Sequence, residues 1–214
     1  MDLELFLWAT FLGFLWCQVV THYAVSVGLH RYFAHNQFKT SLFHEVGFII
    51  GIMIACVRTP IGWVASHRMH HADTEGPLDP HDAKQIGYWK VATTTWDLKH
   101  VPIKFAKDLY DNPRLVWAHE NWDTFLWYYW AACMLISPYF WWAAAFMPYV
   151  FAKVGFGMLN IFGHWNGPTD GVWMNWILGG DGYHKVHHEH PYRLKLGKYD
   201  LGGYLAERFW KKKL

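Results

Sequence analysis

The apolar residues of this chain fall into a few long runs separated by polar stretches. The first run, residues 3–28, contains one acid at its edge, Glu4, and no lysine or arginine. A helix of this length can cross about 30 Å of hydrocarbon. Its acidic start and long apolar stretch distinguish it from a cleaved signal peptide. The first basic residues, Arg31 and Lys39, follow the run, so the positive-inside rule predicts an outside N-terminus and a cytoplasmic His30.

The second run, residues 42–65, is interrupted by polar side chains. It carries His44, Glu45 and Arg58, and its uninterrupted apolar core, residues 46–57, is short. A core of that length is more typical of an interfacial or buried helix, or of a tight hairpin, than of a simple span. The pattern therefore predicts an interfacial or re-entrant segment.

A third apolar block, residues 122–162, is long enough for two helices. The dipeptide Ser137-Pro138 is the favoured turn between them, and Met147-Pro148 is the alternative. Either choice leaves one of the two helices short.

The remaining stretches are polar and rich in turn formers. Residues 73–121 contain scattered glycine and proline and are expected to form loops and short helices outside the bilayer. The tail from Tyr183 onward is basic and ends in Lys211, Lys212 and Lys213, which suits a cytoplasmic face beside anionic lipid. We therefore expect one all-α domain over residues 1–214, an integral membrane helical bundle with spans at about residues 3–28, 122–136 and 139–162.

Composition agrees with a membrane protein. Hydrophobic residues make up 53% of the chain and charged residues 17%, and the aromatic content is high, as expected for rings at a bilayer interface or around an apolar cavity. The net charge of +2 gives no indication of a nucleic-acid partner. The three cysteines are scattered in apolar runs, which favours buried hydrophobes over a disulfide framework or a thiolate metal site.

The histidines gather in clusters at the edges of the apolar runs. On a helix, positions i, i+3 and i+4 share one face, so each of two HxxHH clusters can point at one spot. His30 and His35 are about 140° apart on an ideal helix and converge only if the helix ends or loosens between them. The clusters are His30 and His35; His67, His70 and His71; His184, His187 and His188; and Asn160 with His164.

Topology allows the clustered histidines to meet on one side of the bilayer. The chain crosses an even number of times between clusters if the second run dips or lies flat, so all nine can lie at the cytoplasmic face. Neutral imidazole suits zinc, copper, iron and nickel. Nine histidines exceed the four ligands of a structural zinc and indicate two metals. With no thiolate and few carboxylates nearby, a cytoplasmic, histidine-rich di-iron cap is the leading prediction.

Four segments of the chain resemble the membrane fatty acid desaturase family, and more narrowly its acyl-CoA or acyl-lipid delta-9 type. The matching segments are HRYFAH, HRMHH, NIFGH and HKVHH, together with DTEGPLDPH after the second and GGDGYHKVHHEHP around the last. The chain departs from the family in having one clear span before the first box, where two are usual. Asp181 stands where the family often has Glu, and Lys185 and Val186 replace a usual polar pair.

The resemblance implies an enzyme that uses O2 and two electrons to place a cis double bond in a long-chain acyl group. Asn160 would hold a water near one iron. The implied ligands of the two irons, which are also the implied catalytic residues, are His30, His35, His67, His70, His71, His164, His184, His187 and His188.

Residues next to the boxes are candidates for supporting roles. Trp63 and Trp165 are candidate walls of an apolar acyl tunnel, although interface anchoring or packing is the more common role of a single tryptophan. The acids nearest the boxes, expected to orient the imidazoles, are Asp73, Asp79 and Asp181. Arg31 and Arg68 adjoin predicted ligands and either pair with acids or meet an anionic headgroup. The other histidines, expected to be structural, are His22, His44, His81, His100, His119 and His190.

The implied partners are an acyl substrate carried on CoA, acyl carrier protein or lipid, and a separate electron donor of the ferredoxin or cytochrome b5 type. The basic tail and the lysines between Lys84 and Lys107 could dock an acidic carrier, although the same charges suit a cytoplasmic face. Two alternatives stay open: a di-iron hydroxylase or ketolase acting on a lipid or carotenoid, and a non-catalytic membrane metal-binding protein.

Overall fold

The computed structural model describes residues 2–97 and 101–212. His100 and Lys213, which belong to the expected structural histidines and basic tail, lie outside these residues. The described part is mostly helical, as expected. In chain order the elements are α1 Leu3–Val19, η1 Val20–Ala34, β1 Phe38–Lys39, α2 Leu42–Ala55, α3 Pro60–Ala72, α4 Ala83–Ile86, α5 Tyr88–Ala92, η2 Ile103–Phe105, η3 Lys107–Asp111, α6 Pro113–Glu120, α7 Trp122–Ile136, α8 Pro138–Trp141, η4 Trp142–Phe146, α9 Met147–Phe162, η5 Val172–Met174, α10 Asn175–Leu178, α11 His184–Glu189, α12 Leu201–Phe209 and β2 Lys211–Lys212.

The first apolar run forms one continuous helix that extends past the predicted span. Elements α1 and η1 together run from Leu3 to Ala34, which is long and apolar enough to cross a membrane. Many apolar side chains of α1, including Leu7 and Phe11, are exposed, as expected for a helix that faces lipid. The second part, η1, has π-helical winding and is almost entirely buried.

The second apolar run is broken into two helices. Elements α2 and α3 bend by 89° at the short break after Ala55. Cys56 ends α2 in the left-handed region at φ 47°, and Pro60 begins α3, a position that proline favours. Such a bend is found in a broken span or in a re-entrant segment. The interfacial or re-entrant placement of residues 42–65 stays a prediction.

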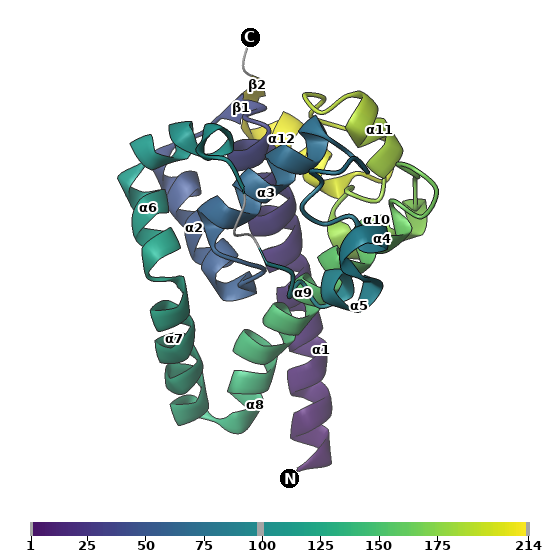
Figure 1. The fold of residues 1–214 in the computed structure, drawn as a ribbon. Coiled ribbons are helices and arrows are strands. Elements are labelled where there is room, and N and C mark those ends of the chain that lie inside the picture. The colour runs from purple at the N-terminus through teal and green to yellow at the C-terminus, as the bar shows by residue number, and fades with distance from the viewer. Residues whose placement is uncertain (1, 98–100, 213–214) are drawn as a thin grey trace.

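The third apolar block turns at Ser137-Pro138, as predicted. Elements α8, η4 and α9 form a continuous 25-residue helix over Pro138–Phe162, the second of two single helices in the described chain that are long and apolar enough to span. Helix α7 has 15 residues and is therefore about 22 Å long, which is short of the roughly 30 Å of a bilayer core. Figure 1 shows α7 and α8 as a hairpin at the same end as the N-terminus.

The polar stretch forms short helices, and a small strand pair departs from the all-α expectation. Elements α4 and α5 lie within residues 83–92, and elements η2, η3 and α6 lie within residues 103–120. The strands β1 and β2 pair antiparallel, with Phe38 opposite Lys212. This pair ties the segment after η1 to the end of the described chain.

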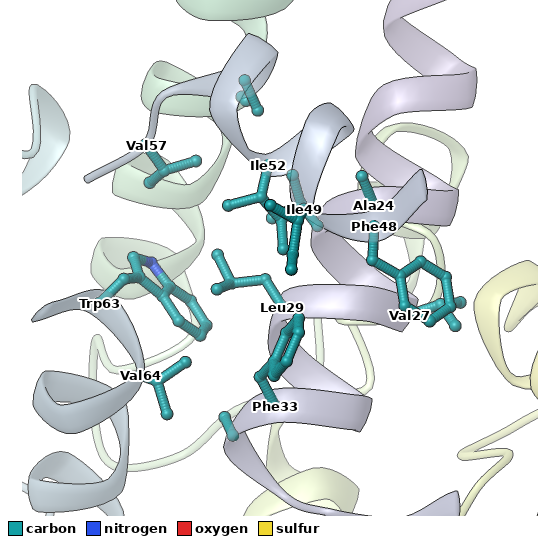
Figure 2. Packing of buried hydrophobic residues seen from close by; sticks show 14 of the residues in the cluster. Ala24, Val27, Leu29, Phe33, Phe48, Ile49, Ile52, Val57, Trp63 and Val64 are labelled. Carbon is teal, nitrogen blue, oxygen red and sulfur yellow. The ribbon is translucent and has the colours of Figure 1, made fainter. Parts of the chain in front are cut away.

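The hydrophobic core lies between η1, α2, α3 and α9. Figure 2 shows side chains from η1, α2 and α3 directed into one shared cluster, among them Leu29, Phe48, Ile52 and Trp63. Elements α3 and α11, which carry two of the histidine clusters, lie at the end of the molecule opposite to the N-terminus (Figure 1). Helix α3, which contributes Trp63 and Val64 to the core, therefore connects the core with this end of the molecule.

Candidate metal centre

His30 and His35 converge because η1 is wound more widely than an α-helix. The His35 amide donates to the His30 carbonyl oxygen, five residues back, at 3.1 Å. An i→i+5 bond brings residues five apart onto nearly the same side, and such windings are frequent at functional sites. The ring centroids lie 4.9 Å apart. The expected loosening of the helix is thus a widening of its turns.

Two other elements bring HxxHH clusters to the same place. Helix α3 carries one at its C-terminal end, and the short helix α11 carries the other along its length. The amides of Lys185 and Val186 at the start of α11 donate to Asp170 Oδ1 at 2.8 and 3.3 Å. His164 follows the end of α9. A side chain at Gly163 would clash with the His184 ring, which lies 2.7 Å from the position of a Cβ there.

The first histidine group contains four buried rings from η1, α3 and α11. The ligand nitrogens of His30, His35, His67 and His187 all lie within 4.8 Å of one another. The closest Nε2–Nε2 pairs are His30 with His187 at 3.0 Å and His35 with His67 at 2.8 Å.

The second group contains four rings from α3, the end of α9 and α11. The ligand nitrogens of His70, His164, His184 and His188 also lie within 4.8 Å of one another. The Nε2 atom of His164 is 3.0 Å from that of His70 and 2.6 Å from that of His184. The ninth ring, His71, lies between the groups: its Nε2 is 2.9 Å from His187 Nε2, and it stacks on His188 at 4.3 Å between centroids.

These separations fit nitrogens that share a metal ion. Two imidazole nitrogens bound at about 2.1 Å and about 90° apart lie about 3.0 Å from each other. The observed Nε2 pairs fall close to this value. The donor set, imidazole without thiolate, suits iron, zinc, copper or nickel.

Carboxylates fix which nitrogen of several rings faces the centre. His70 Nδ1 lies 2.8 Å from Asp79 Oδ2, and His164 Nδ1 lies 3.3 Å from Glu75 Oε1. Because a carboxylate accepts hydrogen bonds, each Nδ1 donates, and each Nε2 of a neutral ring carries a lone pair. These two lone pairs face each other across 3.0 Å. A cation between them relieves the repulsion, so the residues present fit a metal ion.

Burial keeps the rings outside the helical spans neutral. It lowers the pKa of His184 and His187 well below the usual 6.5 and that of His188 to about 3, and repulsion among neighbouring histidine charges adds to the effect. Neutral imidazole is the form that binds a metal.

The two buried acids that contact histidines differ in their surroundings. Burial raises the pKa of the Asp79 carboxyl to about 6, although amide hydrogen bonds oppose the shift. Burial acts to raise the pKa of Asp181, but the Arg31 guanidinium and the hydrogen bonds from His30 and Ser26 outweigh it, so this pKa lies below the usual value. Both acids are therefore largely ionised at pH 7.

Of the three acids predicted to orient imidazoles, two contact a histidine and one does not. Asp79 and Asp181 contact His70 and His30, at 2.8 and 3.1 Å. Asp73 does not take this position: its Oδ2 accepts from the Leu78 amide at 2.6 Å and closes a turn in the same loop. The prediction that Asp73 orients an imidazole is wrong, because its side chain bonds to the backbone of its own loop.

Two residues near the centre were not predicted. Glu75 contacts His164, 89 residues away in sequence. His81, expected to be structural, forms a third candidate group with His70 and Asp79, and its ring lies 4.2 Å from that of His70. The only sequence signal was their place in the loop that follows the second box.

The two tryptophans lie in different environments. Trp63 is buried, and its ring stacks on His67 at 4.8 Å between centroids. Trp165 is 55% exposed, and its ring lies beside that of Tyr88. Asn160 is half-buried on α9, one turn before His164.

The arginines beside the boxes pair with acids. Arg31 is fully buried and contacts Asp181 and Asp200 at 3.1 and 2.9 Å. Arg68 contacts Asp108 through both terminal nitrogens, at 2.6 and 3.0 Å. His22, in the first span, also has a partner: its Nδ1 lies 2.6 Å from the Gln18 carbonyl oxygen.

Comparison with known proteins finds several similar fatty acyl enzymes. A (11Z)-hexadec-11-enoyl-CoA conjugase of Bombyx mori is 26% identical over 197 residues, covering 80% of this chain and 59% of the relative. An acyl-CoA Delta(11) desaturase of Spodoptera littoralis is 26% identical over 211 residues, covering 86% and 62%. A sn-1 stearoyl-lipid 9-desaturase of Synechocystis is 23% identical over 217 residues, covering 91% and 65%. The chain is homologous to fatty acid desaturases.

The homology extends over only part of the length of these relatives. No protein-family model matches the chain. This desaturase homologue spans about three fifths of the length of the curated relatives that it matches. The resemblance of its histidine boxes to desaturases is confirmed at the level of homology.

Proposed function

We propose that this desaturase homologue is a membrane oxidoreductase. It introduces a cis double bond into a long-chain fatty acyl group, using O2 and two electrons at a histidine-ligated di-iron centre. The observation that carries this proposal is the facing pair of Nε2 lone pairs on His70 and His164, 3.0 Å apart, within two groups of four imidazoles. The names of the relatives supply the reaction class.

The proposed ligands of the His30-side metal are His30, His35, His67, His71 and His187, and those of the His70-side metal are His70, His164, His184 and His188. A bound pair of irons would supply the oxidising power for an unactivated C–H bond, which side-chain acids and bases cannot break. The protein's part is to hold the imidazoles neutral, orient them through Asp79, Asp181 and Glu75, and exclude water. Asn160 is proposed to hold a water on the His164 side.

An apolar groove offers the acyl chain a place near the His30-side metal. It measures about 600 Å³ and lies between η1, α10 and α12, with Val19, Tyr23, Trp176, Leu201 and Leu205 among its lining residues. His22 also lines it, and Ser26, four residues further along η1, bonds to Asp181. Trp63, stacked on His67, is proposed to close the inner side of the site. Trp165 is proposed to contact the substrate where it enters from the surface.

We propose that the chain is an integral membrane protein whose metal centre lies on the cytoplasmic face. The proposed partners are an acyl substrate linked to CoA, acyl carrier protein or lipid, and a separate electron-donor protein. Support comes from the two helices able to span a membrane and from the position of α3 and α11 opposite to the N-terminus.

The test is to express the chain in a host that lacks unsaturated lipids and to profile its fatty acids by mass spectrometry. We expect a new product two hydrogens lighter than a host acyl chain. His70→Ala should abolish it, while His119→Ala, away from both histidine groups, should not. A product heavier by one oxygen would instead favour the hydroxylase alternative, and metal binding without any product would favour a non-catalytic protein.

A further inference from the structure

Two of the histidine boxes carry an arginine directly after the first histidine, and the two arginines have different surroundings. Arg68, after His67, is partly exposed and contacts Asp108, whose side chain is 56% exposed. Arg31, after His30, is fully buried. Its guanidinium bonds to two acids, to Ser26 and to the Leu194 carbonyl oxygen. A buried guanidinium with this many acceptors has one fixed orientation.

The buried guanidinium acts on His30 through one carboxylate oxygen. Asp181 Oδ1 accepts from His30 Nδ1 at 3.1 Å, from Arg31 Nη1 at 3.1 Å and from Ser26 Oγ at 3.0 Å. The other oxygen, Oδ2, is buried and has no hydrogen-bond partner among the described residues. The contact between Asp181 and His30 therefore depends on where Arg31 holds that single oxygen.

Asp200 shares the same guanidinium. It accepts from Arg31 Nη2 at 2.9 Å, and from the amides of Leu196 and Gly203 at 2.7 Å each. It is fully buried, and its described hydrogen bonds include none to a histidine. Asp200, Arg31, Asp181 and His30 thus form a chain of contacts in that order.

The acid on the other side of the centre is held differently. Asp79 accepts from His70 Nδ1 and from the backbone amides of Glu75 and His81. Its described hydrogen bonds come from no arginine. In the described contacts no arginine offsets the charge of Asp79, whereas Arg31 partly neutralises the charge of Asp181 and also contacts Asp200.

We propose that Arg31 is a positioning residue for the His30-side metal: it fixes Asp181 against His30, and Asp200 sets how much of the guanidinium charge falls on Asp181. This inference rests on the proposed metal centre. A carboxylate behind a ligating histidine raises the basicity of the ring, and its loss typically weakens metal binding by about 10- to 100-fold. When Asp200 loses its charge, the Arg31 guanidinium interacts with the charge of Asp181 alone and neutralises more of it. The hydrogen bond from His30 to Asp181 then weakens, and so does binding of the His30-side metal.

The test uses the full chain in detergent, loaded anaerobically with ⁵⁷Fe²⁺. Release of iron to a chelator is followed over time, and Mössbauer spectra report the environment of each ion. In Asp200→Asn we expect one of the two ions to leave about tenfold faster, and one of the two Mössbauer doublets to change. The other ion should leave at its wild-type rate. Asn keeps an acceptor for the α12 cap.

The matched control is Asp108→Asn, which removes the acid paired with the other box arginine and should leave both release rates unchanged. Arg31→Lys is the second variant, in case Asp200→Asn does not fold. An ammonium keeps the charge but cannot bridge two acids as the planar guanidinium does, so it should also speed the loss of one ion.

Three results would count against these ideas in different ways. Wild-type release rates in both Asp200→Asn and Arg31→Lys would overturn the positioning role. Equal acceleration of both ions would also overturn it, because general loosening of the fold explains that result. A wild-type chain that binds no iron would count against the proposed centre itself, and the inference would fall with it.

Discussion

At the scale of single residues, the carboxylates behind the imidazoles decide the chemistry of the centre. Each of Asp79, Asp181 and Glu75 accepts a hydrogen bond from the Nδ1–H of one histidine and so leaves Nε2 free as a ligand atom. The same contacts fix the orientation of the rings.

Replacement of Asp79 by Ala should weaken metal binding. His70 then loses the acceptor that fixes its tautomer, so we expect the metal affinity to fall about 10- to 100-fold. Metal content after dialysis against a graded chelator measures the change. Asp73→Ala is the matched control, since Asp73 lies in the same loop but bonds to a backbone amide. A similar loss in both variants would contradict an orienting role for Asp79.

Replacement of Leu205 by Trp should reduce turnover of long acyl chains more than of short ones. Leu205 lines the apolar groove between η1, α10 and α12, and a larger side chain removes part of its volume. The product distribution from a mixture of acyl lengths measures the effect. If the distribution is unchanged while the protein still turns over, the acyl chain does not occupy this groove.

The histidines could be predicted from the sequence, but not all of their supports. Spacing of i, i+3 and i+4 is a local signal, and it predicts that each HxxHH cluster points at one spot. The structure instead divides each cluster between the two groups: His67 and His187 lie in the first, and His70 and His184 lie in the second. Asp79 and Asp181 were found because they stand close to boxes. Glu75 was missed because its contact with His164 joins segments 89 residues apart. Nearness in sequence also gave the wrong prediction that Asp73 orients an imidazole, because its carboxylate closes a turn instead.

At the scale of elements, winding and bending place the boxes. At the 3.6 residues per turn of an ideal α-helix, His30 and His35 would diverge. Nothing in the apolar pattern of residues 20–34 marks the wider π winding, because almost every side chain there is buried whatever the period. The break between α2 and α3 was foreseeable from the short apolar core, whereas its 89° angle depends on packing.

Replacement of Gly157 by Ala should destabilise the packing of α5 on α9. A Cβ at this position would lie 2.1 Å from the Ala92 carbonyl oxygen, which is backbone and cannot move aside cheaply. We expect a loss of about 1–3 kcal/mol in the free energy of unfolding, measured by thermal unfolding in detergent. Gly155→Ala on the same helix meets only the end of the Leu178 side chain at 3.1 Å and should cost little. Equal losses would rule out the backbone contact as the cause.

At the scale of the whole molecule, the proposed ions join segments that are distant in the sequence. The nine histidines come from η1 and its end, α3, the end of α9, and α11. An ion bound by several of these elements binds the folded chain and not the unfolded one, so it stabilises the fold.

Removal of the metal should lower the melting temperature of the protein. For free metal at about a hundred times its dissociation constant, the linked stabilisation is about 2.7 kcal/mol, which corresponds to a fall of about 5–10 °C in a chain of this size. Scanning calorimetry with and without chelator measures it. A His35→Ala variant should melt lower from the start and respond less to the chelator. A wild-type melting temperature that does not change with chelator would contradict a metal that supports the fold.

The helical membrane character was predictable because long apolar runs are a strong signal. The Ser137-Pro138 turn and the predicted segment at about residues 122–136 match the extent of α7, whereas the pairing of β1 and β2 was not predicted. Two-residue strands leave no periodic pattern, and their pairing joins segments at opposite ends of the chain. Contacts of this kind follow from the assembled fold and not from local sequence.

The continuous helix from Leu3 to Ala34, which is long and apolar enough to cross a membrane, carries His30 close to its C-terminal end. A rod longer than the hydrocarbon layer accommodates a thinner or thicker bilayer by tilting. Because His30 is part of that rod, a change of tilt displaces it relative to α11. Under the proposed membrane location, we therefore expect metal binding to depend on lipid chain length, and reconstitution into bilayers of graded thickness should reveal an optimum.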